Sequence, residues 1–289
     1  GRMAGDRGDR LPPALDHGPA PVQRGGRLML RYLRLLRVFA ATELQFEIEY
    51  RANLLVELLQ MVVVIATSLA AALLLYVYTS QLNGWSLGEM LVLLGVFYVV
   101  QGAEETIFQP SFAKFMEHVR QGTLDFILLK PVSSQFLVSV RHMQLVQVAQ
   151  LALGLAIVGA GLSRIEALTP GTSLAFGIAL VCGFVLVYAL LLALATLAFW
   201  FVRVDDIFAI FWAFLDAARF PIDIYPGWLR LTLSTVVPIG IAVTVPAQAI
   251  AGRLDPAGLA VLIIAAVAAA IVSHRLWRVG LRSYTGASA

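Results

Sequence analysis

Long apolar runs separated by short polar stretches dominate the chain. Residues 58–78 contain no charge and are long enough to cross about 30 Å of hydrocarbon as a helix. Runs of the same kind predict further spans at residues 89–109, 135–162, 172–202 and 256–274, and another beginning near Ile207. The pattern therefore predicts an all-α integral membrane protein with six transmembrane helices.

Small residues interrupt the later half of the third predicted span. They are Gly154, Gly159, Ala160 and Gly161. Small side chains let two transmembrane helices approach closely, because their backbones meet without intervening bulk. We expect this half of the span to pack tightly against a neighbouring helix.

Composition agrees with a membrane protein and excludes several kinds of site. Hydrophobic residues make up 60% of the chain and charged residues 13%, against about 25% charged in soluble domains. The single cysteine, Cys182, excludes an intrachain disulfide and a cysteine metal cluster. The histidines are scattered and show no HExxH spacing: His17, His118, His142 and His274.

The N-terminal part of the chain is polar and basic. Residues 1–27 are rich in Gly, Pro, Arg and Asp and are expected to form a disordered N-terminal segment, with the transmembrane domain at 28–289. In residues 28–53, Arg31, Arg34 and Arg37 alternate with apolar positions at helical spacing. This pattern is typical of an amphipathic helix in the cytoplasmic membrane interface.

Residues 231–250 are apolar but are divided by Pro238 and Pro246. If this segment crossed the membrane there would be seven spans, and the termini would lie on opposite sides. If it enters and returns on the outer side, six spans remain, and all but four of the 21 Lys and Arg residues lie inside. The positive-inside rule favours this re-entrant hairpin, with both termini cytoplasmic.

A short polar-flanked segment lies between the second and third spans. Gly122 can end the preceding helix, Thr123 can cap a new one, and Asp125 lies in its first turn. Pro131 ends that helix, and Ser133 or the next serine can cap the following span. The helix carries more apolar surface than a solvated loop needs: Leu124, Phe126, Ile127, Leu128 and Leu129. We expect it to press on a partner, although a plain connector at the membrane surface fits the same pattern.

Two sequence blocks are similar to those of ABC-2 type exporter permeases, within a bacterial subfamily of poorly defined substrate. The blocks are residues 122–131, GTLDFILLKP, and residues 220–226, FPIDIYP, followed by VPI at 237–239. The order of parts agrees from residue 28 to the C-terminus. The resemblance implies a dimer of permeases, identical or related, that works with two ATPase subunits. It also implies that the helix between spans 2 and 3 docks into a groove of the ATPase.

On this resemblance the ATPase-coupling residues are Thr123, Leu124, Asp125, Phe126, Leu128 and Lys130, with a smaller second contact at Arg203, Asp205 and Asp206. Charged residues within the spans are costly unless they face protein or water. Those expected in the translocation path or dimer interface are Glu104, Glu105, Asp216, Arg219 and Asp223. For Asp216 and Arg219, three residues apart on one helix face, an internal salt bridge explains the charges equally well.

The chain lacks an ATPase of its own. A phosphate-binding loop needs GxxxxGK[ST], and neither Lys114 nor Lys130 lies in such a motif. We therefore expect a non-catalytic subunit without a bound cofactor, with ATP and Mg²⁺ on the partner ATPase. The expected surroundings are the lipids of a bacterial inner membrane, and no nucleic acid.

Three other functions compete with this interpretation of the sequence. An intramembrane serine hydrolase is disfavoured because residues 171–175, GTSLA, do not complete GxSxG. An ABC importer is disfavoured because residues 117–122 do not match the Glu-Ala-Ala…Gly loop of importers. A secondary transporter or channel that uses Glu104, Glu105, Asp216 and Asp223 without an ATPase remains the main alternative.

Overall fold

The computed structural model describes residues 21–165, 169–201 and 205–284. Helix makes up 83% of the structure, and no strand is formed in these ranges. Packing divides the chain into two compact units, residues 1–38 and 39–289. The described part of the first unit is the beginning of helix α1, and the second unit contains all the other helices. The predicted all-α architecture is confirmed.

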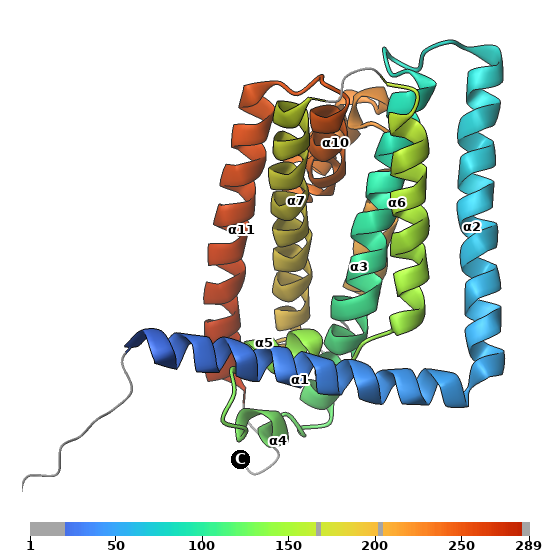
Figure 1. The fold of residues 1–289 in the computed structure, drawn as a ribbon. Helices are drawn as coiled ribbons and strands as arrows, with labels where there is room; N and C mark the ends of the chain where they lie inside the picture. Colours follow the sequence, from blue (N-terminus) through green and yellow to red (C-terminus); the bar gives the residue numbers. More distant parts are fainter. Residues whose placement is uncertain (1–20, 166–168, 202–204, 285–289) are drawn as a thin grey trace, which may run out of the picture. The chain divides into compact units, whose positions relative to one another are not determined.

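The helices in chain order are α1 (Pro21–Glu49), α2 (Arg51–Tyr78), α3 (Leu87–Arg120), α4 (Asp125–Leu128), α5 (Ser134–Val140), α6 (Val148–Leu162), α7 (Pro170–Thr196), α8 (Asp205–Ala217), α9 (Gly227–Leu231), α10 (Ile239–Ile250) and α11 (Pro256–Ser283). Short 3₁₀ turns follow at Leu145–Gln147, Leu197–Phe199 and Ile222–Ile224, and a π-helical turn at Thr232–Val236. Figure 1 shows α3, α6, α7, α10 and α11 together, with α2 beside them.

Five helical stretches of the described chain are long and apolar enough to cross a membrane: α2, α3, α6 with its preceding turn, α7 with its following turn, and α11. The third predicted span, 135–162, is not continuous, because the chain leaves the helical path between α5 and the turn at Leu145–Gln147. The fifth also differs from expectation. Its helix, α8, has 13 residues and is too short to cross as a single helix.

The amphipathic N-terminal helix exists but has other bounds than predicted. It begins at Pro21 rather than residue 28 and ends at Glu49 rather than residue 53. Tyr50 is not helical, with φ −99° and ψ 48°, and separates α1 from α2. Part of the predicted disordered segment, residues 21–27, is therefore helical, and residues 1–20 lie outside the described ranges.

Glycines bring α3 and α6 into backbone contact. A Cβ atom added to Gly95 would lie 2.6 Å from the backbone nitrogen of Val158, and one on Gly161 would lie 2.8 Å from the carbonyl oxygen of Gly88. On α6, Gly154 would meet the backbone of α3 at 2.8 Å. The two helices run antiparallel, and the contacting glycines repeat every seven residues along each. This spacing keeps one seam of small residues facing the partner helix.

The close packing expected of this span is confirmed at Gly154 and Gly161. It is wrong for Gly159 and Ala160. An added Cβ on Gly159 meets nothing within 4 Å, and both residues are exposed on the side of α6 that faces away from α3.

The loop between α2 and α3 marks one end of the bundle. The amide of Asn83 donates to the carbonyl oxygen of Asp223 at 2.9 Å. Arg253 donates to the carbonyl oxygen of Gly84 at 2.8 Å and contacts Glu89 at 3.2 Å. The segment that holds α9 and α10 thus starts and finishes at the same end, and its two halves meet at 89°. The α4–α5 segment follows the opposite end of α3.

Candidate functional site

Helix α3 ends in a Schellman motif. Gly122 adopts φ 68°, and its N–H donates to the carbonyl oxygen of Val119 at 3.2 Å. The N–H of Thr123 reaches the carbonyl oxygen of His118 at 2.9 Å. This pair of bonds defines the motif and needs the left-handed conformation that glycine adopts without strain. The predicted role of Gly122 is confirmed.

Thr123 has another role than the predicted N-cap. Its hydroxyl lies 2.8 Å from the Nδ1 atom of His118, so it ties the segment back to α3. The N-cap position of α4 belongs to Leu124, which has no side chain that can accept a hydrogen bond. The helix is accordingly only four residues long. Ser133 does cap α5, accepting from the N–H of Phe136 at 3.4 Å, as one of the two predicted serines.

The apolar side chains of this segment divide into two sets. Leu124 and Ile127 are buried in the core of the chain, and Leu128 packs partly against it. Phe126 and Leu129 point outward, with exposed fractions of 72% and 82%. Of the apolar residues expected to touch a partner, Phe126 is therefore free to do so. Leu124 has no accessible surface, and Leu129 was not among the predicted contacts.

An aromatic cluster lies where α3, the end of α7 and α11 meet. Phe199 is 5.5 Å from Phe115, 5.7 Å from Trp277 and 6.0 Å from Tyr284, measured between ring centroids. Burial and the nearby Asp125 carboxylate raise the pKa of Tyr284, partly offset by the backbone N–H groups at the start of α4. The cluster thus joins α3, the end of α7 and α11, and Tyr284 brings it close to the start of α4.

Lys130 is the other charged residue of the segment. It is exposed, and partial desolvation together with Arg141 lowers the pKa of its ammonium group. Its distance in sequence from Asp125 places opposite charges at the two ends of α4, negative at the N-terminus. This is the arrangement that a helix dipole favours.

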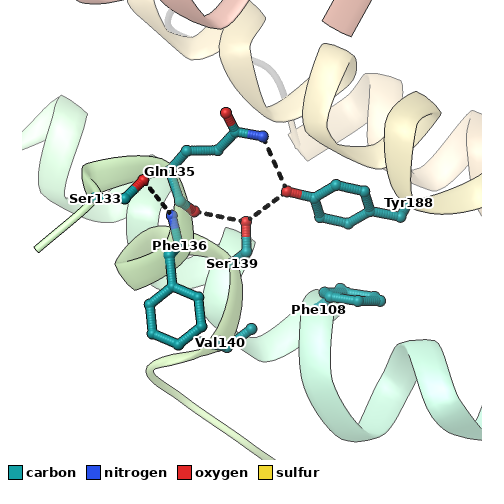
Figure 2. Close-up of a pocket in the computed structure, with 7 residues that line it drawn as sticks. All are labelled: Phe108, Ser133, Gln135, Phe136, Ser139, Val140 and Tyr188. Atoms are coloured by element: carbon teal, nitrogen blue, oxygen red, sulfur yellow. Dashed lines mark hydrogen bonds between the residues drawn. The ribbon is translucent and has the colours of Figure 1, made fainter. Parts of the chain in front are cut away.

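A second set of contacts links α5 to the bundle (Figure 2). The Tyr188 hydroxyl of α7 lies 3.0 Å from the Ser139 hydroxyl and accepts from the Gln135 amide at 3.2 Å. The other end of the Gln135 amide lies 2.8 Å from Nδ1 of His274 on α11. Gln135, Ser139 and Tyr188, with Phe108 of α3, line a pocket of about 310 Å³. Gln135 therefore bridges α5, α7 and α11.

The acidic end of α1 holds the break between α5 and α6. Glu47 accepts from the N–H of Leu145 at 2.5 Å and from that of Val146 at 3.3 Å. Burial raises the pKa of Glu47, although these two N–H groups oppose the shift. Glu43 lies 3.1 Å from Nδ1 of His142, whose pKa is lowered by burial despite that contact. This docking could not be predicted from the sequence, because it depends on a helix break at residues 141–144.

The carboxylates expected in the translocation path lie in α3 and near α8. Glu104 is fully buried, and neither carboxylate oxygen has a hydrogen-bond partner among the described residues. Its neighbour Glu105 accepts from the amide of Gln101 at 2.9 Å. A buried carboxylate without a partner is costly, so Glu104 is the least compensated polar group of the described bundle.

Asp216 and Arg219 are in contact at 2.8 Å, as the three-residue spacing predicts. The arginine also lies over the ring of Phe97 on α3, with 5.4 Å from Cζ to the ring centroid. Asp223 is separate, since its backbone meets the loop between α2 and α3. The five predicted path residues therefore do not form one cluster.

The smaller contact expected at residues 203–206 is only partly visible. Arg203 lies outside the described residues. Asp205 and Asp206 are the first two residues of α8, and their side chains also fall outside the described part of the chain.

Comparison with known proteins supports the resemblance noted in the sequence. A family model described as ABC-2 family transporter protein matches residues 62–288. No curated protein and no solved structure matches the chain. The match begins within α2, at residue 62, and continues through α11. The chain belongs to the ABC-2 family of transporter proteins and is a multi-pass membrane protein.

Proposed function

We propose that this chain is the permease subunit of an ATP-driven exporter and dimerises to form the translocation path. A separate ATPase, which carries ATP and Mg²⁺, docks on the α4 segment. The main supporting observation is the exposure of Phe126, on a helix of four residues, and of Leu129, the C-cap of that helix. Exposing two large apolar side chains to water on so short a segment costs free energy. Two such side chains are also too few to hold a helix in lipid. A groove on a partner protein removes them from water.

The surroundings of α4 fit a transmitting role. Its buried side chains, Leu124 and Ile127, join the core of the bundle, and the Schellman motif fixes its orientation relative to α3. Through the aromatic cluster and Gln135, a displacement of α4 and α5 bears on α3, α7 and α11 together. A rigid connection of this kind is what couples a partner's movement to packed helices.

We further propose that the α4 end of the bundle faces the cytoplasm of a bacterial cell. The acidic end of α1 and the C-terminal end of α11 both contact this end, through Glu47 and His274. Both chain termini would then be cytoplasmic. The α9–α10 segment begins and ends beside the loop between α2 and α3, which supports a re-entrant hairpin from the outer side. Residues 205–223 then make the sixth crossing in broken form.

The path itself is assigned to the polar groups on α3 and α8. Glu104, Glu105, Asp216 and Arg219 lie within the stretch between the two ends of the bundle, and Asp223 lies at the proposed outer end. We assign the second ATPase contact to Arg203, Asp205 and Asp206, of which the two aspartates begin α8.

The test is isolation of the tagged permease from its native host in mild detergent. We expect an ATPase subunit with a GxxxxGK[ST] motif to accompany the wild type and to be lost from Phe126→Ala and Leu129→Ala. Trp228→Ala is the matched control, since Trp228 is equally exposed, at 71%, but lies in the α9 segment. Isolation of a folded permease without any ATPase would overturn the proposal and favour a secondary transporter or channel.

Topology is tested separately. An epitope inserted after Arg253 should be reached by antibody on intact cells. Cysteines introduced at Arg31, Arg34 or Arg37 should react with an impermeant maleimide only after the cells are opened. The reverse result at either place would invert the assigned sides.

A further inference from the structure

Between α2, α3 and the start of α6 lies a polar pocket that shares Glu105 with the proposed path. Its volume is about 360 Å³, and five glutamines, two glutamates and Tyr98 line it. We propose that this pocket binds a protonated amine that also carries a hydroxyl or ether oxygen, as in amino alcohols and amino sugars. That this amine is the exported substrate rests on the proposed function, whereas its binding does not.

Two buried polar atoms of the lining are without partners in the described structure. Gln150 is only 6% exposed, and its amide nitrogen has no hydrogen-bond acceptor. The carbonyl oxygen of Gln101 has no donor, because the amide nitrogen of that residue is directed to Glu105. Buried polar groups are nearly always satisfied, so an unpaired donor and an unpaired acceptor on two lining side chains indicate that these amides turn toward a polar ligand when it binds.

The charged residues that line the pocket indicate the charge of its ligand. Glu57 and Glu105 come from α2 and α3, and no Lys, Arg or His belongs to the described residues that line the pocket. Anionic headgroups are therefore disfavoured, and a cation is favoured by two carboxylates. An ammonium group can donate to Glu105 and to the unpaired oxygen of Gln101. A hydroxyl or ether oxygen beside it can accept from Gln150.

The pocket has polar surroundings on the side of the α1–α2 junction. A smaller cavity of about 80 Å³ shares Glu57 and Gln144 with it, and continues to Glu47 and Asn53. The amide of Gln144 donates to Glu57 at 3.3 Å, so one carboxylate serves both cavities. A ligand can thus enter the pocket from the same end of the bundle that carries α4.

Binding is tested with the purified full-length permease and matched pairs of probes. Glucosamine against N-acetylglucosamine, by calorimetry in detergent, tests a soluble amine. Sphinganine against N-acetylsphinganine, by native mass spectrometry from nanodiscs, tests a lipid amine. We expect one of the two amines to bind saturably, and its acetylated counterpart to bind at least about tenfold more weakly because it lacks the charge. The arm that responds identifies the source of the amine.

Variants locate the site. Glu105→Gln removes the charge with almost no change of shape, and Gln150→Met replaces the unpaired donor by a side chain of similar length. Each should weaken amine binding about tenfold, whereas Glu117→Gln, on the exposed end of α3, should not. Equal binding of charged and acetylated probes, absence of binding in both arms, or full binding by both pocket variants would overturn the inference. Retention of the ATPase by such a permease would leave the proposed function intact.

Discussion

Helices α2 and α4 both expose large apolar side chains, for different physical reasons. On α2, Leu55 and Leu59 are each 65% exposed and Val63 is 54% exposed. Only 17% of the most apolar 18 residues of this helix are buried. Phe126 on α4 and Leu129 directly after it are exposed even more. The 28 residues of α2 are long enough for lipid to cover them, whereas the four residues of α4 are not.

Exposure of an apolar side chain is thus informative only together with the length and flanks of its helix. Lipid covers the surface of a long helix with few charges, and no single apolar side chain on it is essential. A four-residue helix, placed between a Schellman motif and a capped helix, holds its two exposed side chains in fixed directions. That arrangement suits a specific protein contact, and the following changes test the distinction.

The largest effect is expected from a charge on α2. Val63→Asp places a carboxylate near the middle of the span, at a cost of about 3 kcal/mol for insertion. Little folded protein should reach the membrane. Phe126→Asp places the same carboxylate on α4, where we expect normal insertion but loss of the ATPase.

Membrane yield and size-exclusion profiles of fluorescent fusions measure insertion, and co-isolation measures the ATPase. Val63→Leu serves as the control for the position on α2. Equal loss of folded protein in both aspartate variants would show that α4, too, lies in lipid.

The next largest effect is expected at the contact between α3 and α6, where the chain buries its own apolar surface. Gly95→Leu should destabilise the α3–α6 seam by about 1–3 kcal/mol, because a Cβ already meets the backbone of α6. Gly159→Leu is the matched control, on the open side of α6. Thermal unfolding in detergent should show a clear loss for the first variant and almost none for the second. Similar losses for both would contradict the close approach of the two helices.

The smallest effect is expected for the ion pair of Asp216 and Arg219. With Asp216 54% exposed, the pair resembles surface pairs worth about 0.2–1 kcal/mol, less than a buried pair. Asp216→Asn, Arg219→Gln and the double variant form a cycle that measures this coupling from unfolding free energies. A coupling of zero would leave the contact of Arg219 with Phe97 as the reason for its position.

Much of the fold follows from local chemistry that the sequence displays. The long apolar runs predict the spans, and Gly122 and Ser133 mark the end of one helix and the start of another. The sequence also shows the seven-residue spacing of Gly88, Gly95 and Gly102 on α3. This spacing was sufficient to predict that α3 packs against α6.

What the sequence did not predict depends on tertiary contacts. The break at residues 141–144 is held by Ser111, which bonds both the N–H and the carbonyl group of His142, and by Glu43 and Glu47 from a distant helix. Leu124 and Phe126 are equally apolar, and only the packed structure separates the buried one from the exposed one. The polar pocket similarly arises from glutamines that are far apart in the chain.

The central claim, that α4 docks into an ATPase, is tested most directly by photo-crosslinking. A photoreactive amino acid replaces Phe126 in the native host, and Trp228 in a parallel strain, and both are irradiated in intact cells. We expect the probe at residue 126 to cross-link to a polypeptide that carries GxxxxGK[ST], and the probe at residue 228 not to do so. Cross-linking of residue 126 to lipid alone would contradict the account.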